Sequence, residues 1–210
     1  MKDLDIIIFR GVDFVSKTIQ RLQSQFLRKE KAFSHVALVI STKIVDHPNM
    51  VPDKFYIWES TMSGKLSDGV LNIDGKSFFG AQVRDLDLVV NAYKKAGGDA
   101  SLISINLKKT PSKRRFQKIF NKYNGANYDM NFISLLSSLY PKLRCIRGKI
   151  EKYLHTDNWL FCSELCAIAY KEMKIIPNLN TKNVVPEDFV GTSDADKQIP
   201  NGMFEAPVPL

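Results

Sequence analysis

The sequence predicts an α+β domain, with strands in the first half of the chain and helices in the second. Three observations support this prediction. Runs rich in β-branched and aromatic residues, such as HVALVI (35–40) and KFYIWE (54–59), occur before residue 107. Apolar residues at helical spacing dominate after residue 110. A length of 210 residues with 44% hydrophobic side chains suits one domain with a substantial core.

The first half should contain several short strands and two helical segments. Apolar residues at helical spacing predict a helix over 12–28, and a second helical piece should end near Gly97–Gly98. Four glycines between 62 and 80 predict a loop or short ribbons there. The expected strands are 5–9, 35–40, 54–59, 81–86 and 102–107, with 54–59 as the hairpin partner of 35–40.

The second half should contain three longer helices. Thr110 as N-cap and Pro111 at the first helical position predict a helix that ends near 124–125. Apolar periodicity predicts two more helices, over 130–140 and 161–175, each closed by a following proline. A short helical turn is expected at 185–189, and the residues from 192 on are expected to form a tail.

Cysteine content and hydropathy exclude several protein classes. Three cysteines form neither a disulfide framework nor a zinc-ligand pattern, so we expect free thiols in a reducing, cytoplasmic-type compartment. The N-terminal apolar run is too short for a signal peptide, and no stretch approaches the roughly 20 apolar residues that span a bilayer. We therefore expect a soluble or peripheral protein.

The net charge of +8 is concentrated in two basic runs, which suit phosphates of nucleic acid or anionic lipid, or simply a solvated helix face. An apolar stretch (130–143) followed by Arg144, Arg147 and Lys149 can lie on an anionic membrane, or its apolar side can face the core. Aromatic residues in the first run have the spacing of a core face, so nucleic acid is the weaker partner. The runs are Lys108, Lys109, Lys113, Arg114, Arg115, Lys118 and Lys122, and then Lys142, Arg144, Arg147, Lys149 and Lys152.

Cys162 stands where a polar stretch turns into an apolar helix, with Asp157 or Asn158 as the expected N-cap. A thiolate there would be stabilised by the helix N-terminus and by a neighbouring imidazolium. His35 opens a buried strand, and alternation places it on the face opposite Val36. A Cys162–His35 pair is therefore possible, although a cysteine in an apolar helix is more often part of the core.

Glu59, at the end of the neighbouring strand, is the candidate for orienting His35, and Asp46 is a weaker one. Several rivals stay open. His155 is a second possible base, and Cys145 has a basic setting that could activate it. His47 is expected in a solvated turn. Cys166, deeper in the helix, fits the core better than Cys162 does.

These residues fall within motifs that resemble the circularly permuted papain-like thiol enzymes of the NlpC-like superfamily, in particular the YiiX-like branch, which includes poxviral members. FSHVALVI resembles the histidine strand of that superfamily, and FCSEL resembles its nucleophile motif. The order, histidine before cysteine, is also the same. Further similar motifs are DIIIFRG (5–11), WES (58–60), GANYDM (125–130) and VVPEDF (184–189). Leu4 stands where the family usually has glycine.

The resemblance implies a circularly permuted papain-like fold, in which an antiparallel sheet bearing His35 and Glu59 packs against a helix bearing Cys162. It implies a catalytic domain over 1–191, with a basic helical elaboration at about 108–152 and a tail over 192–210. The expected activity is acyl transfer through a thioester on Cys162, as a hydrolase (peptidase, amidase or esterase) or a lipid acyltransferase, with no cofactor or metal. The alternatives are a catalytically silent binding or virion structural protein and a basic nucleic-acid-binding module.

Overall fold

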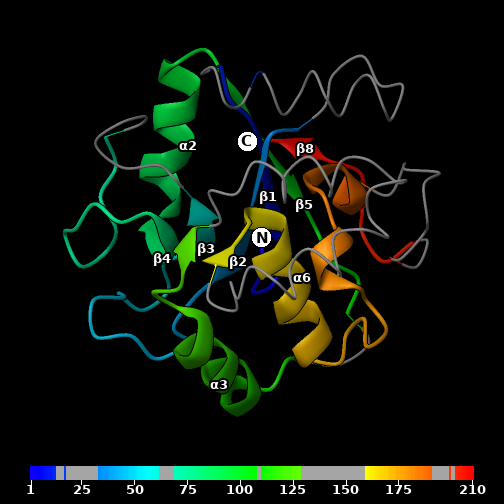
Figure 1. The fold of residues 1–210 in the computed structure, drawn as a ribbon. Helices are drawn as coiled ribbons and strands as arrows, with labels where there is room; N and C mark the ends of the chain where they lie inside the picture. Colours follow the sequence, from blue (N-terminus) through cyan, green and yellow to red (C-terminus); the bar gives the residue numbers. More distant parts are fainter. Residues whose placement is uncertain are drawn as a thin grey trace.

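The structure is a computed structural model, and it describes residues 1–12, 17, 33–61, 69–107, 110–128, 159–190, 199 and 202–210. It is an α+β fold, as predicted (Figure 1). The predicted helices at 12–28 and 130–140 lie outside the described residues, apart from residues 12 and 17. The main elements are β1 (Ile6–Arg10), β2 (His35–Ile40), β3 (Tyr56–Thr61), β4 (Gly80–Asp85), α2 (Leu86–Lys95), β5 (Asp99–Ile103), α3 (Lys113–Tyr123) and α6 (Cys162–Glu172).

The sheet has the strand order β7-β6-β4-β3-β2-β1-β5-β8. Its short edge strands are β6 (Asn127–Tyr128), β7 (Trp159–Leu160) and β8 (Val208–Pro209). The β6–β7 pair is parallel, and the other pairs are antiparallel. β3 pairs with β2, as the hairpin prediction required. β1 lies between β2 and β5, so the sheet is assembled from strands distant in sequence.

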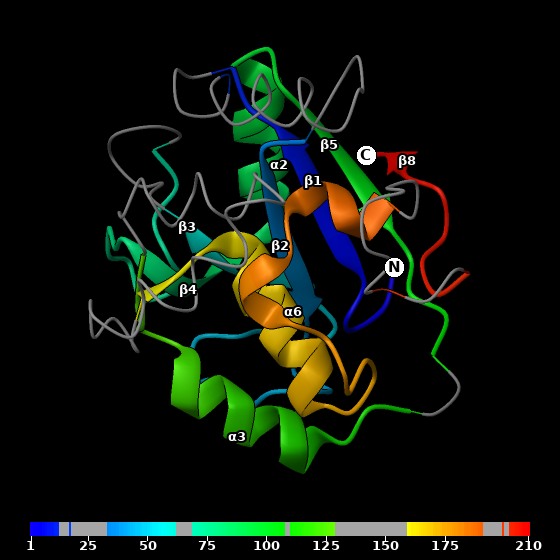
Figure 2. The same cartoon turned by 45° about the vertical axis from the view of Figure 1, so that its right-hand side comes forward.

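Two hydrophobic clusters cover the two faces of the sheet. α2 packs on one face with Ala37 and Val39, and α6 and α3 pack on the other with Val36 and Leu38 (Figure 2). This division confirms the alternation predicted for β2. In the larger cluster, the fully buried Trp58 packs its ring on Phe116 and Phe120, at centroid distances of 5.7 and 5.4 Å. The aromatic residues of the first basic run therefore face the core.

Helix α3 begins later than predicted. Its N-cap is Ser112, whose hydroxyl accepts a hydrogen bond from the Arg115 N–H at 3.4 Å, so the prediction of Thr110 as N-cap was wrong. Serine is as good an N-cap as threonine, and the proline at 111 precedes the cap instead of following it. The helix ends at Tyr123 with Asn124 as C-cap, close to the predicted end.

β5 begins three residues before the expected strand at 102–107. The turn after α2 is short, because the Gly98 N–H donates to the Tyr93 carbonyl, so the next residue already lies in the sheet. α6 ends at Glu172, followed by two short 3-10 helices, η1 (Thr181–Asn183) and η2 (Pro186–Val190). η2 corresponds to the predicted helical turn. Within the segment expected as a tail, Phe204 is buried and β8 pairs with β5.

Candidate functional site

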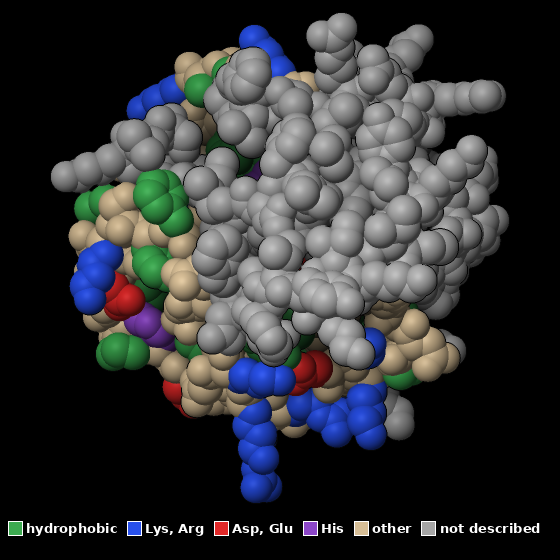
Figure 3. Space-filling model, viewed as in Figure 1, with side chains coloured by type: hydrophobic (Ala, Val, Ile, Leu, Met, Phe, Trp, Pro, Cys, Tyr) green, Lys and Arg blue, Asp and Glu red, His purple; other side chains and the backbone are tan. Residues whose placement is uncertain are grey.

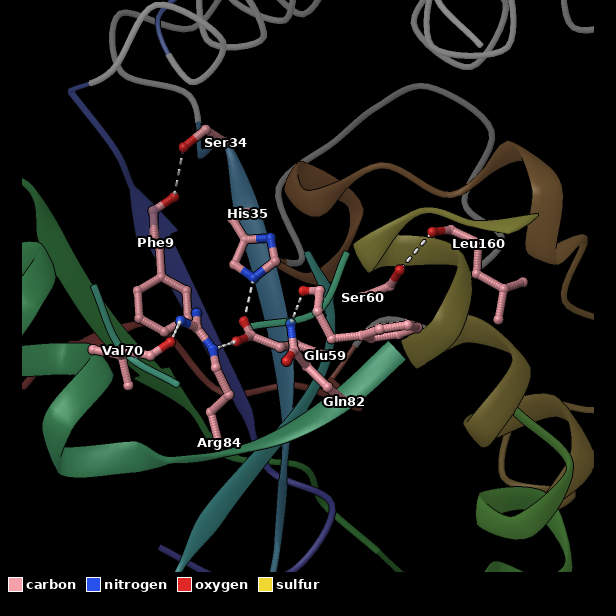
Figure 4. A network of polar contacts seen from close by, with 10 residues as sticks. Phe9, Ser34, His35, Glu59, Ser60, Val70, Gln82, Arg84 and Leu160 are labelled. Atoms are coloured by element: carbon pink, nitrogen blue, oxygen red, sulfur yellow. Dashed lines mark hydrogen bonds and ion pairs between the residues drawn. The ribbon is translucent and has the colours of Figure 1, made fainter. Parts of the chain in front are cut away.

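The ring of His35 is fixed at the first residue of β2. The Ser34 hydroxyl, just before it, donates to the Phe9 carbonyl at 3.3 Å and accepts from the Gly11 N–H at 3.0 Å (Figure 4). The Phe9 ring lies against the imidazole with 5.6 Å between centroids. The Phe33 N–H donates to the buried carboxylate of Glu187, on η2, at 3.2 Å. The start of β2 is therefore held by contacts from both β1 and η2.

His35 Nε2 contacts Glu59 Oε2 at 2.5 Å. Glu59 lies on β3, and its side chain is completely buried. The register of β2 and β3 puts Leu38 opposite Trp58, so Ala37 is opposite Glu59 and both side chains share the face that carries His35. The sequence prediction that brought Glu59 to His35 agrees with this geometry.

Arg84 on β4 makes the second contact of Glu59, which sequence reasoning missed. Its Nε donates to Glu59 Oε1 at 2.5 Å, and its Nη1 donates to the Val70 carbonyl at 3.4 Å. The guanidinium side chain is completely buried. Figure 4 shows the Glu59 carboxylate between the His35 ring and Arg84. Alternation in the predicted strand puts Arg84 on the polar face with Gln82, opposite Ala81 and Val83, so the sequence pattern did not indicate that Arg84 is buried.

Cys162 is the first residue of α6, so its N–H, like the others of the first turn, lacks a partner within the helix. The N-cap is Phe161, which has no capping side chain, so the prediction of Asp157 or Asn158 as cap was wrong. Two side-chain hydrogen bonds lie at this end of the helix: the Ser163 hydroxyl donates to the Val184 carbonyl at 2.6 Å, and the Ser60 hydroxyl of β3 donates to the Leu160 carbonyl at 2.6 Å. They hold the start of α6 against the sheet.

The pKa of His35 connects the thiol with the imidazole. Burial alone would lower this pKa, but the negative charges of Cys162 and Glu59 and hydrogen bonds to both side chains raise it to about 10. Burial would likewise raise the pKa of Glu59, but Arg84 and His35 lower it to about 2. Nε2 is the ring nitrogen that contacts Glu59. The pKa of His35 therefore responds to both Cys162 and Glu59.

The other candidates lie elsewhere. Cys166 is completely buried one turn behind Cys162, and burial raises the pKa of its thiol well above the ordinary value, as suits a core cysteine. Asp46, the weaker acid candidate, is exposed and binds Lys113 Nζ at 2.6 Å. His47 is half-buried, 3.7 Å from Asp74, and is not in a fully solvated turn. Cys145 and His155 lie outside the described residues.

The described part of the basic segment presents its charge on α3. Arg114, Arg115 and Lys118 are exposed, while Phe116 and Ile119 are buried. Lysine and arginine side chains gather along the lower edge of Figure 3, where α3 lies in Figure 1. The second basic run, with Arg144, Arg147 and Lys149, lies outside the described residues.

Within the described ranges, no group of three or more His, Cys, Asp or Glu residues is arranged to hold a metal ion. Over the same residues, none of the helices combines the length and the apolar character needed to cross a bilayer.

Comparison with known proteins finds similarity among solved structures only. No protein-family model matches the chain, and no curated protein does. Among solved structures, the chain is similar to the metalloprotein YiiX from Escherichia coli O157:H7, with 15% sequence identity and a TM-score of 0.47. The match covers 82% of this chain and 66% of YiiX, so this chain spans about two thirds of the length of that protein.

Proposed function

We propose that the protein is a cysteine-dependent acyl-transfer enzyme, with Cys162 as nucleophile, His35 as base and Glu59 as the group that orients His35. One observation supports this most: the buried His35 ring contacts Glu59 through Nε2 at 2.5 Å and interacts with the Cys162 side chain. A thiol, an imidazole and a carboxylate in this order are the parts that covalent acyl transfer needs.

The fold proposed for this site is a circularly permuted papain-like domain. Its support is the arrangement of a helix that begins at Cys162, packed against an antiparallel sheet that carries His35 and Glu59. The histidine strand precedes the cysteine helix along the chain, as in the family that the sequence motifs resemble. Many folds belong to the α+β class, so the class alone does not support the proposed fold. The support comes from the places of Cys162, His35 and Glu59 in the helix and the sheet.

In the proposed mechanism, Cys162 first transfers its proton to His35. The sulfur then attacks a carbonyl carbon, and a C–S bond forms while the carbonyl electrons move to oxygen. The tetrahedral intermediate collapses to a thioester, and the bond to the leaving amine or alcohol breaks as that group takes the proton from His35. Water or another acceptor then gives a proton to His35 and attacks the thioester. The C–S bond breaks, the acyl product leaves, and the sulfur takes the proton back from His35.

The first turn of α6 is the proposed source of oxyanion stabilisation. The N–H of Cys162 has no partner within the helix and points out of the helix N-terminus, where the dipole also favours negative charge. Removal of one such donor typically lowers kcat by about 10²–10³-fold in other acyl-transfer enzymes.

Either a peptide amide or a lipid ester is a possible acyl donor, and either water or an alcohol or amine is a possible acceptor. A lipid donor is compatible with the exposed cations of α3, Arg114, Arg115 and Lys118, which suit an anionic membrane surface. We also propose that Arg144, Arg147 and Lys149 bind an anionic membrane. Sedimentation with phosphatidylserine vesicles tests this partner, and the absence of binding at low salt would leave a soluble peptide donor.

Mass spectrometry with a panel of acyl probes, lipid esters and peptide amides, tests the activity. We expect an acyl adduct on Cys162 that Cys162→Ser abolishes and His35→Ala slows, and that Cys166→Ala leaves in place.

Iodoacetamide at pH 6–7 should label Cys162 much faster than Cys145 or Cys166. Equally slow labelling of all three cysteines, with no adduct, would instead indicate a catalytically silent binding protein. Steeply salt-dependent RNA or DNA binding would then favour the nucleic-acid module.

A further inference from the structure

The carboxylate of Glu59 is shared between two cations. Its Oε2 contacts His35 Nε2 and its Oε1 accepts from Arg84 Nε, both at 2.5 Å. The side chains of Glu59 and Arg84 are completely buried, so neither is screened by solvent. Taking a charged group out of water is unfavourable unless that group is paired, so Glu59 and Arg84 depend on each other.

Arg84 is one end of a row of four groups: guanidinium, carboxylate, imidazole and thiol. With Arg84 and Glu59 both charged, their charges cancel. The row is then also neutral when His35 is an imidazolium and Cys162 a thiolate. Without Arg84, the same ionic state carries a net negative charge in a buried site. The neutral state would then be Glu59 carboxylate, His35 imidazolium and Cys162 thiol, so the thiolate would be disfavoured.

We propose that Arg84 is a positioning residue of the catalytic cluster: its buried positive charge holds the Glu59 carboxylate in place and balances the thiolate of Cys162. This inference rests on the proposed function, because it assigns Arg84 a role in forming the nucleophile. The lowered pKa of Glu59, to which Arg84 makes the largest favourable contribution, agrees with it. Arg84 acts through Glu59 and touches no reacting atom.

The strand position of Arg84 makes this role specific to one side chain. β3 and β4 pair so that Glu59 is opposite Gln82, and Arg84 follows two residues later on the same face. Gln82 uses its amide to donate to the Phe78 carbonyl at 2.7 Å. The next residue, Asp85, pairs with the half-exposed Lys54 at the other side of the strand. Lys54, two residues before β3, therefore offers a control: a cation paired with a carboxylate of β4, outside the cluster.

The test is the rate of Cys162 alkylation by iodoacetamide from pH 5 to 10, with thiolate absorbance at 240 nm as a second readout. In Arg84→Met, the rate at pH 6 should fall at least tenfold and the profile should move to higher pH. Arg84→Lys keeps the charge, so its alkylation rate should stay within a few-fold of the rate for the unmodified chain. The rate for Lys54→Met should equal that of the unmodified chain. A purely structural arginine would lower Tm without moving the pH profile, and that result would overturn the proposal.

A double-mutant cycle tests whether Arg84 acts through Glu59. In Glu59→Gln, the carboxylate that Arg84 holds is gone, so the further change Arg84→Met should alter the alkylation rate less than the same change does in the unmodified chain, because only the direct effect of the Arg84 charge remains. Equal effects in both backgrounds would contradict the coupling. If Arg84→Met alone fails to fold, Arg84→Gln takes its place in the cycle, because it removes the charge while its amide can still donate to the Glu59 carboxylate. Slow alkylation of the unmodified chain would overturn the proposed function as well, whereas fast alkylation with an unchanged Arg84→Met profile would overturn the role of Arg84 alone.

Discussion

Glu59 and Asp46 each bind a cationic side chain at almost the same distance, 2.5 Å to Arg84 and 2.6 Å to Lys113. Their surroundings differ completely. The Glu59 side chain is 0% exposed and the Asp46 side chain 76%. Water and salt screen the exposed Asp46–Lys113 pair, the outer pair, so its loss should change the stability of the protein little. The buried Glu59–Arg84 pair, the inner pair, is shielded from solvent, so each charge depends on its partner for compensation. Burial, and not contact distance, therefore determines what each pair does for the protein.

Removal of Glu59 should have the largest effect on stability. In Glu59→Leu, Arg84 and His35 are left without their carboxylate, and breaking a buried ion pair on one side typically costs about 3–5 kcal/mol. Urea denaturation should show this loss. The matched variant Asp46→Leu should lose less than about 1 kcal/mol. Similar losses in both variants would contradict the difference between the two regions.

The free energy of unfolding should depend on pH through the buried groups around Glu59 and not through the exposed Asp46–Lys113 pair. The folded-state pKa of His35 is about 10, above its ordinary value, so its contribution is complete below about pH 6.5 and is lost as pH rises through 10. Glu59 has a lowered pKa of about 2, so its contribution is present above about pH 4.5 and is lost as pH falls towards 2.

The measurement is the free energy of unfolding at pH 6, 8 and 10 for the unmodified chain and for His35→Gln. The difference between them should shrink as pH rises. A control at the surface, Lys113→Met, should run parallel to the unmodified chain from pH 6 to 9. A difference that grows with pH would mean that the folded state does not favour the imidazolium.

The cap of α3 should give an intermediate effect. Ser112→Ala removes the hydroxyl that accepts from the Arg115 N–H, so it should cost about 1 kcal/mol. Thr110→Ala, at the cap position expected from the sequence, should cost almost nothing. Thermal unfolding of the two variants tests the assignment, and a larger loss at Thr110 would favour the earlier helix start.

The smallest effect should come from the outer pair. Lys113→Met should lose about 0.2–1 kcal/mol at low ionic strength, and less at 1 M salt, because the pair is largely exposed. The measurement is chemical denaturation at both salt concentrations. A loss that salt leaves unchanged would show that Lys113 acts through its second contact, the hydrogen bond to the Thr42 carbonyl at 3.0 Å.

Local patterns predicted the strands well, because alternation and composition act within a few residues. His35–Ile40 was predicted with its correct ends and its two faces, and Glu59 was placed near His35 because hairpin pairing is short-range. Arg84 was missed because its partner is decided by β3–β4 register, which a single sequence does not specify across the loop that separates the strands. Likewise, nothing local in residues 202–210 indicated that they pair with β5.

The bond from the Phe33 N–H to Glu187 joins residues 154 positions apart. During synthesis, the strands that carry His35, Glu59 and Arg84 leave the ribosome well before α6 and η2, and the sheet can pair while Cys162 is still untranslated. The proposed nucleophile therefore joins His35 only at the last stage of assembly. On this proposal, the nascent chain stays inactive until α6 has been made, and truncated products keep Glu59 and Arg84 without Cys162.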